Sequence, residues 1–178
     1  MGFRLQGMPL AARSLRRVCV DGQDINARTE MALASLMSGL ALANAGLGVV
    51  HGFAGPLGGM FDAPHGAICA ALLPHGMAAN LAHLRRDQQD YPNSRELIER
   101  YRTVARCLTG QDDAEPEDGV RFIRGLMDEL KVRTLRNFGM GPEHADEIVE
   151  SARRANSMKN NPVRLSSWEL KQIYLKAL

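Results

Sequence analysis

No charged side chain occurs between Met31 and Phe61, and this feature limits the possible folds more than any other part of the sequence. Such a stretch is either packed among other segments of a folded chain or placed in a membrane, where a helical span takes about 20 apolar residues. Asn44, His51 and Pro56 interrupt the stretch, several glycines break it further, and no basic flank marks one of its ends. We therefore expect a buried core helix followed by a tightly packed glycine-rich helix, with a small membrane protein as the weakest alternative.

The rest of the chain also favours helices. No run of four to eight residues alternates between apolar and polar side chains, as a half-buried strand would. The predicted fold class is all-α, a helical bundle of about seven to nine helices with the Ala/Gly-rich second helix at its centre. Pro9 is expected in the first turn of the first helix. Predicted helices cover roughly residues 9–20, 24–45, 67–84, 93–110 and 142–155, another follows the acidic loop 111–118, and the last runs from a capping box at 166–169 to residue 178.

The composition is that of an ordinary globular domain. The 178 residues include 22 Lys and Arg against 20 Asp and Glu, a net charge of +2, which gives no electrostatic reason to bind nucleic acid or an acidic membrane surface. Aromatic residues make up only 5%, so stacking on single-stranded nucleic acid is not expected either. The three cysteines show no CxxC spacing, and the first residues contain no secretory signal. We expect a single α-helical domain over residues 1–178, in the reducing cytoplasm, without a disulfide framework.

Two of the five histidines, His51 and His65, lie in or beside the charge-free stretch, fourteen residues apart. Neutral imidazole is the commonest side-chain ligand for metals in proteins. Glycines at 52, 55, 58 and 59 remove side chains from the space between them, which is typical of a place where a cofactor or substrate approaches the backbone. The spacing matches no local ligand motif. The residues alone leave two interpretations open: a shared metal or catalytic site, or two core histidines bonded to carbonyl groups.

The remaining candidates rank below this pair. Cys69, one helical turn beyond the second of these histidines, either faces the same pocket or fills the core as a small residue. His75 follows Pro74, where we expect a kink or break in the helix, and it either caps that break or has a functional role. His83 and His144 have polar neighbours in the sequence and are expected to be solvated.

The segment GLGVVHGFAGPLGGMFDAPHGAICAALLPH, which contains both histidines, resembles the signature region of the iron-containing (group III) alcohol dehydrogenases. In that family a Gly-Leu-Gly precedes one metal-binding histidine, and a Pro-His-Gly places the second one fourteen residues later. Asn44 fits the family's Asn-x-Gly-Leu-Gly pattern, and NNPVRLSSWELKQIYLKAL is similar to its terminal segment. The resemblance covers essentially the whole chain. It implies a dehydroquinate synthase-like, all-α C-terminal domain in which His51 and His65 are catalytic residues and bind the metal, either iron(II) or zinc.

The chain also departs from the family pattern. The family's N-terminal half, an α/β domain that binds NAD(P), is absent from these residues, so the resemblance implies a truncated chain that needs a missing nucleotide-binding domain or a partner chain. The family's other two metal ligands, an Asp followed four residues later by a His, have no counterpart before His51, because neither Asp21 nor Asp24 has a His four residues later. Gly55 stands at a cofactor-binding position where many members carry a His near the nicotinamide, so a proton relay is missing there.

The resemblance implies an NAD(P)-dependent oxidoreductase, in which a divalent metal lowers the pKa of an alcohol that then loses hydride to the nicotinamide. The expected substrates are small alcohols, or aldehydes and ketones in the reverse direction, and a homodimer is expected as one form of the protein. The alternative is a non-catalytic relic, or a dimerisation or structural helical module without metal.

Overall fold

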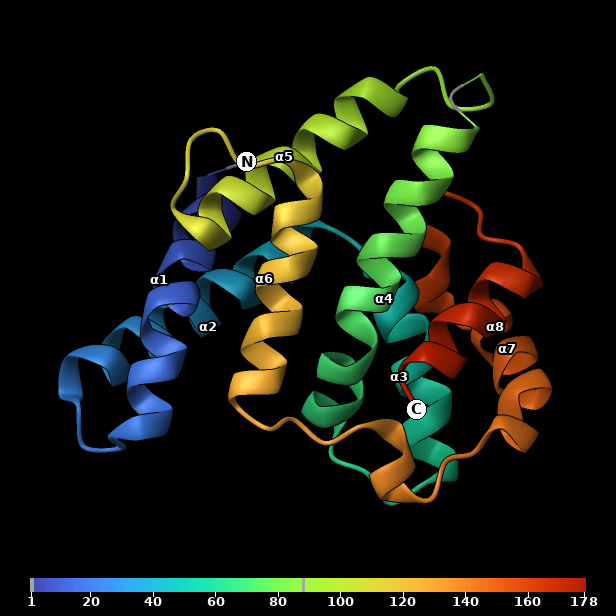
Figure 1. The fold of residues 1–178 in the computed structure, drawn as a ribbon, viewed down its shortest axis with the longest axis horizontal. Coiled ribbons are helices and arrows are strands. Elements are labelled where there is room, and N and C mark those ends of the chain that lie inside the picture. The colour runs from blue at the N-terminus through green and yellow to red at the C-terminus, as the bar shows by residue number, and fades with distance from the viewer. Residues whose placement is uncertain (1, 88) are drawn as a thin grey trace. The chain divides into compact units, whose positions relative to one another are not determined.

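The computed structural model describes residues 2–178 except residue 88, with side chains from residue 6 onward (Figure 1). The described residues form eight α-helices and three short 3₁₀ helices but no strand, which confirms the all-α prediction. The α-helices are α1 (Gly2–Val20), α2 (Ile25–Asn44), α3 (Val49–Met60), α4 (His65–Arg86), α5 (Ser94–Thr109), α6 (Pro116–Glu129), α7 (Ala145–Arg154) and α8 (Ser167–Lys176). The 3₁₀ helices are Leu135–Phe138, Pro142–His144 and Asn156–Asn160.

The described chain divides into two compact units, and the single domain expected over residues 1–178 stays a prediction. The first unit comprises the residues up to Ala45 together with Glu99–Phe122. The second unit comprises Gly46–Ile98 and Ile123–Leu178. One boundary lies between α2 and α3 and the other two fall inside α5 and α6, so each unit is built from two separate stretches of the sequence.

In the first unit, α1 and α2 form a helical hairpin. Asp24 caps α2, because its side chain accepts a hydrogen bond from the backbone N–H of Ala27 (2.9 Å). Glu30 of α2 accepts hydrogen bonds from Arg13 and from the buried hydroxyl of Ser14, both in α1. These polar contacts fix how far the two helices are shifted along one another.

Two predictions about this hairpin are wrong. α1 begins at Gly2, so Pro9 lies inside the helix, which continues although one backbone hydrogen bond cannot form there. α2 is not a buried central helix. Its buried residues are Ala27 and Ala34, whereas four leucines (33, 36, 40 and 42) are between 43% and 60% exposed. The small residues of α2 allow close packing on α1 along one line, and the leucines lie outside that contact.

The second unit contains the main hydrophobic core. α3 packs against α4 and α7, and α8 packs against α4 and α7 (Figure 1). α3 is the last part of the charge-free stretch, and α4 follows that stretch in the sequence. Since the two helices pack together in this core, residues of α4 lie beside residues of α3. The large side chains of the core that are completely or almost completely buried are Phe53, Leu57, Ile68, Leu72, Leu135, Ile148, Leu170 and Tyr174.

Two local predictions about the helices of this unit can be compared with the structure. α8 begins with the predicted capping box: the Ser166 hydroxyl accepts from the Glu169 backbone N–H (3.2 Å), and the Glu169 carboxylate accepts from the Ser166 backbone N–H (2.7 Å). α4 is continuous, and Pro74 lies inside it, so of the predicted kink or break the break is absent.

One helix of the described chain, α4, is long and apolar enough to cross a membrane, and α2 and α3 would make a second candidate if the two were counted as one broken span. Length and composition alone select these helices, and the core helix of a soluble protein meets the same criteria. In α4, half of the apolar window is buried inside the structure. Ile68 and Leu72 of α4 belong to the core, so this helix already has a protein environment for its apolar face.

Candidate metal centre

His51 lies in the first turn of α3, and a set of hydrogen bonds fixes the start of this helix. Gly48 precedes α3 in an extended conformation. The Oδ1 atom of Asn161 accepts from the backbone N–H of Val49 (3.0 Å) and from the side chain of Asn80 in α4 (3.1 Å). These contacts tie α3 to α4 and to the segment that follows the 3₁₀ helix Asn156–Asn160. They thereby set the position of His51.

The side of α3 that faces the core is also closely packed. A Cβ atom on Gly52 would lie only 2.6 Å from the Cε atom of Met158, so glycine lets this segment approach the helix. Phe53 is completely buried. Because the core side of α3 is occupied in this way, His51 lies on a partly exposed part of the helix.

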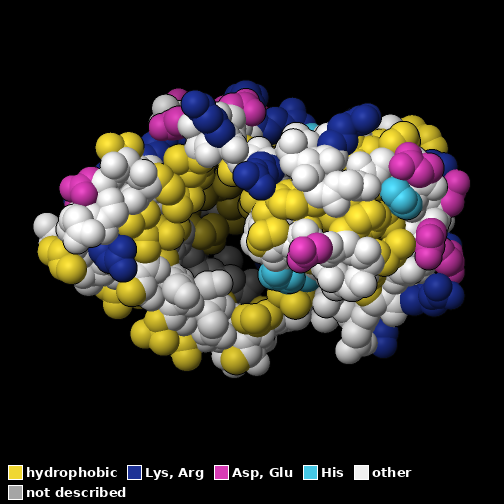
Figure 2. Space-filling model, turned by 90° about the horizontal axis from the view of Figure 1, so that it is seen from below, with side chains coloured by type: hydrophobic (Ala, Val, Ile, Leu, Met, Phe, Trp, Pro, Cys, Tyr) yellow, Lys and Arg dark blue, Asp and Glu magenta, His cyan; other side chains and the backbone are white. Residues whose placement is uncertain are grey.

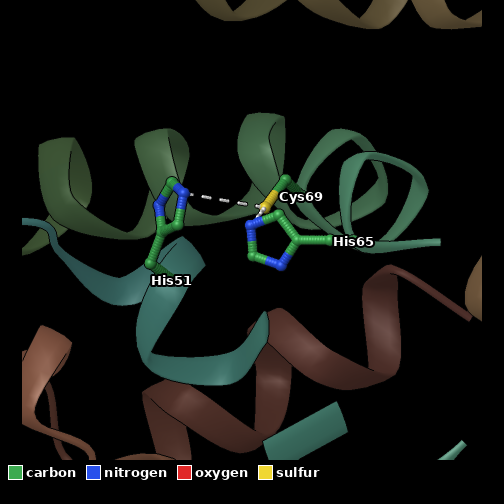
Figure 3. Close-up of side chains that lie close together, drawn as sticks. All are labelled: His51, His65 and Cys69. Atoms are coloured by element: carbon green, nitrogen blue, oxygen red, sulfur yellow. Dashed lines mark hydrogen bonds between the residues drawn. The ribbon is translucent and has the colours of Figure 1, made fainter. Parts of the chain in front are cut away.

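His65 is the first residue of α4, directly after Pro64. Cys69 lies four residues further along the same helix, and residues with this spacing share one face. The sequence left open whether Cys69 faces the histidines or fills the core. The structure places it beside both of them (Figure 3).

The three side chains form a tight group. The ring centroids of His51 and His65 are 5.4 Å apart, with an angle of 46° between the ring planes. The Sγ atom of Cys69 lies 3.4 Å from the Nε2 atom of His65 and 3.9 Å from that of His51 (Figure 3). One donor atom of each residue lies within 4.8 Å of the other two. The structure therefore brings together the two histidines that the sequence singled out, and their role as metal ligands stays a prediction.

The electrostatic environment favours uncharged donors. Burial, and to a smaller extent the neighbouring His65, lowers the pKa of His51, so that its imidazole is neutral at pH 7 and has a free lone pair. Burial raises the pKa of the Cys69 thiol. No carboxylate joins the group within the described part of the chain. A cation entering this group would therefore meet no positive charge already fixed on His51.

The donor set suits a divalent metal ion. Around a tetrahedral zinc ion, nitrogen ligands at about 2.0 Å and a sulfur ligand at about 2.3 Å lie about 3.3–3.5 Å from one another. The observed sulfur–nitrogen distances of 3.4 and 3.9 Å are close to this requirement. His65 is exposed, so the group is open to solvent on one side. The side chains could thus bind a metal and still leave a coordination position for a small molecule.

Gly55, the predicted cofactor-binding position, lies in α3 one turn after His51 and is exposed. A Cβ atom added to Gly55 would have no neighbouring atom within 4 Å. The space next to His51 on this side of α3 is therefore free of other side chains. Its relation to a nicotinamide stays a prediction.

The other histidines lie outside the group. His75 is partly buried in α4, and its Nδ1 atom is buried without a hydrogen-bond partner. Burial, with the charges of Arg124 and Lys176, lowers the pKa of His75 to about 4. His144 is partly buried, and its Nδ1 atom accepts from the backbone N–H of Gly141 (3.1 Å), so its expected solvation is only partial.

The prediction that His83 is solvated is wrong. His83 is only 7% exposed, and its Nδ1 atom donates to the Glu169 carboxylate over 2.8 Å. Arg86 binds the same carboxylate (3.1 Å). Burial alone would raise the pKa of Glu169, but the hydrogen bonds from His83, Ser166 and Arg86 lower it to about 2. The sequence identified Glu169 only as part of a capping box, because its contact with His83 joins positions 86 residues apart.

Comparison with known proteins gives one consistent result. The model of the Fe-containing alcohol dehydrogenase family, C-terminal part, matches residues 2–178. The chain is 48% identical to the 1,3-propanediol dehydrogenase of Citrobacter freundii and 32% identical to that of Klebsiella pneumoniae, in each case over 97% of this chain and 43% of the relative. The solved structure of an alcohol dehydrogenase from Oenococcus oeni superposes with a TM-score of 0.82 at 29% identity, over 98% of this chain and 44% of that one.

The chain thus spans less than half the length of these relatives. Within that span, the family model matches residues 2–178 and the fold superposes over 98% of the chain, and His51 and His65 lie side by side in the part of the structure that the family model covers. This chain belongs to the iron-containing alcohol dehydrogenase family and corresponds to its C-terminal part.

Proposed function

We propose that this chain is the metal-binding part of an NAD(P)-dependent, iron-containing alcohol dehydrogenase that oxidises small alcohols or reduces aldehydes and ketones. The observation that carries the proposal is the approach of His51 in α3 to His65 in α4, two imidazoles at a partly open site in a chain of this family. We assign both residues as metal ligands and catalytic residues. We further propose that residues 1–178 act as one helical domain in the cytoplasm.

A divalent metal at this position would polarise the oxygen of an alcohol and lower its pKa, which prepares the carbon for hydride loss. The chain's own residues contribute position and access. The Asn161 contacts hold α3, and therefore His51, in place relative to α4. The exposed side of His65 admits a small molecule, and Gly55 leaves room beside it for a flat group such as a nicotinamide ring.

The proposal assigns nucleotide binding to a part of the protein outside these residues, in a longer chain or in a partner chain. Relatives more than twice as long fit this assignment. A homodimer of the complete protein is part of the same proposal. If the chain bound no metal, the alternative from the sequence would apply, which is a non-catalytic relic, or a dimerisation or structural helical module.

Metal analysis of the purified chain tests the assignment of the ligands. Protein prepared anaerobically without a His tag should contain close to one iron or zinc ion per chain, and His51→Ala or His65→Ala should lose it. His75→Gln, a change in the same helix outside the group, serves as the matched control and should retain the metal. Unchanged metal content in both alanine variants would contradict the assignment.

A second assay tests the reaction. The chain combined with a nucleotide-binding half from a relative should show nicotinamide-dependent turnover of small alcohols, and the His51→Ala variant should not. Absence of turnover with every small alcohol tried, in a preparation that contains metal, would reject the dehydrogenase proposal while leaving the metal site in place.

A further inference from the structure

We propose that Cys69 is a third protein ligand of the metal centre, and that its sulfur makes the centre of this chain a zinc site. The inference rests on the metal-binding part of the proposed function and is independent of whether the chain takes part in alcohol oxidation. It assigns the donors as two imidazole nitrogens and one thiolate sulfur, from α3 and α4.

The position of Cys69 supports the inference geometrically. Its Sγ atom lies 3.4 Å from one ligand nitrogen and 3.9 Å from the other, whereas tetrahedral zinc with one sulfur ligand requires about 3.5 Å. His65 and Cys69 are one turn apart on the same helix, so a metal held by both needs no change in the backbone of α4. The side chains of His51, His65 and Cys69 gather at one place (Figure 3), and one donor atom of each lies within 4.8 Å of the other two.

The charge balance of a metal ion bound by His51 and His65 also supports Cys69 as a ligand. Two neutral imidazoles alone would leave the whole charge of a divalent ion uncompensated in a partly buried place. No carboxylate among the described residues joins the group. A thiolate at Cys69 would supply the negative charge. As the zinc–sulfur bond forms, the thiol loses its proton to the solvent.

The alternative interpretation is that Cys69 only fills space beside the core. Part of its surface does pack against the core of the second unit. A space-filling role, however, needs no polar neighbour, whereas the sulfur here has two ring nitrogens within 4 Å. Cys19 and Cys107 provide the internal comparison, because neither belongs to a group of three donor residues in the described part of the chain.

The sulfur also determines which metal the centre prefers. Thiolate ligands favour zinc over iron(II), and zinc already exceeds iron(II) in the general affinity order for divalent metals. Three protein ligands with a fourth position open to a water molecule or a substrate are the usual arrangement of catalytic zinc. The exposure of His65 leaves room for such a fourth ligand.

Cobalt(II) provides a direct test, because it occupies zinc sites and, unlike zinc, reports its ligands by absorption. The whole chain, reduced and metal-free, is titrated with cobalt(II) and then with zinc. We expect an intense sulfur-to-cobalt charge-transfer band in the near ultraviolet at one cobalt per chain, which zinc then abolishes. The double variant Cys19→Ser/Cys107→Ser, whose only thiol is Cys69, should keep this band.

The variants Cys69→Ser and Cys69→Ala should lose the band and bind zinc at least about 100-fold more weakly, since replacing a direct ligand exceeds the usual effect of changing its hydrogen-bonded neighbours. Circular dichroism of each variant checks that the helices remain folded. If cobalt binds without the charge-transfer band, or if Cys69→Ser binds zinc as tightly as the unmodified chain, Cys69 is not a ligand. That result would leave the two-histidine site of the proposed function intact, whereas absence of any metal binding would reject both.

Discussion

Glu169→Ala should lower the stability of the second unit strongly, because Glu169 is a buried carboxylate with several hydrogen-bond partners. Glu169 is 7% exposed, and its carboxylate accepts from the backbone N–H and hydroxyl of Ser166 (2.7 and 2.8 Å), from His83 (2.8 Å) and from Arg86 (3.1 Å). Alanine removes the carboxylate and leaves the buried His83 without this partner. It also removes half of the capping box at the start of α8.

The expected loss in the free energy of unfolding follows from the effect of these contacts on the pKa of Glu169. The native pKa of Glu169 is about 2, compared with an ordinary value of 4.5. At about 1.4 kcal/mol for each pH unit, this difference corresponds to an upper limit of about 3–4 kcal/mol. The Arg86 side chain is 56% exposed, so solvent screens its share. We therefore expect Glu169→Ala to lower the free energy of unfolding by about 2–3 kcal/mol, and Glu169→Gln, which can still cap the helix, by about 1 kcal/mol.

Urea unfolding followed by the fluorescence of Trp168 measures this change, because the chain has a single tryptophan and it lies next to Glu169. The pH dependence gives a second readout. Since the native pKa is lowered, the carboxylate contributes its full stability above pH 4.5 and loses it as the pH falls towards 2, and Glu169→Ala should remove this dependence.

Glu150→Ala is the matched control, because the ion pairs that Glu150 forms with Arg153 and Arg154, at 3.4 and 3.9 Å, are exposed. We expect it to change the free energy of unfolding by less than about 0.5 kcal/mol. If Glu169→Ala and Glu150→Ala have the same small effect, or if the acid dependence survives in Glu169→Ala, the reasoning about this buried carboxylate is refuted.

Three other predictions concern packing, glycine and pH. Phe53→Ala should lower the free energy of unfolding by about 3–5 kcal/mol, because Phe53 is completely buried, whereas Leu36→Ala, at a residue 60% exposed, should change it by less than about 0.5 kcal/mol in the same urea assay. Gly55→Ala should raise the melting temperature, because the added methyl group meets no atom within 4 Å and alanine favours the helix by about 0.5–1 kcal/mol; a lower melting temperature would contradict the local structure. His75, with a native pKa of about 4 against 6.5 when unfolded, should make the protein less stable as the pH falls from 6.5 to 4, by about 1–2 kcal/mol since its ring is only partly buried; His75→Gln should abolish this dependence, and an unchanged slope would argue against the buried neutral ring.

Features set by neighbouring residues were predictable from the sequence. The caps at Asp24 and Ser166 each depend on a side chain and backbone groups within three residues, and both are present in the structure. The end of α5 at Thr109, before Gly110 with its positive φ of 71°, follows from the conformational freedom of glycine in the same way. The absence of alternating patterns excluded strands for a similarly local reason.

Features that depend on distant residues were not predictable. The charge-free sequence of α2 showed that this helix can be buried but not which of its residues another helix covers, and its leucines are exposed. His83 was expected in solvent because its neighbours in the sequence are polar, whereas its partner Glu169 comes from another helix. Pro74 and Pro9 remain inside helices, since packing on other helices compensates for a single missing hydrogen bond.

The candidate site contains both kinds of feature, one predictable from nearby residues and one that depends on distant residues. The residue types and glycine pattern around His51 and His65 identified the pair, and the family resemblance gave them a role. The sequence left open whether Cys69 faces the same pocket, and only the structure shows its sulfur beside both rings, because this contact depends on how α3 packs against α4.

The central claim is that α3 and α4 build a metal centre from His51 and His65. The most direct test is an anomalous difference map, recorded at the zinc absorption edge, from crystals of the chain grown with zinc. The account predicts a peak about 2.0–2.1 Å from a ring nitrogen of each histidine and about 2.3 Å from the sulfur of Cys69. Zinc bound elsewhere on the chain, with no peak between these residues, would contradict it.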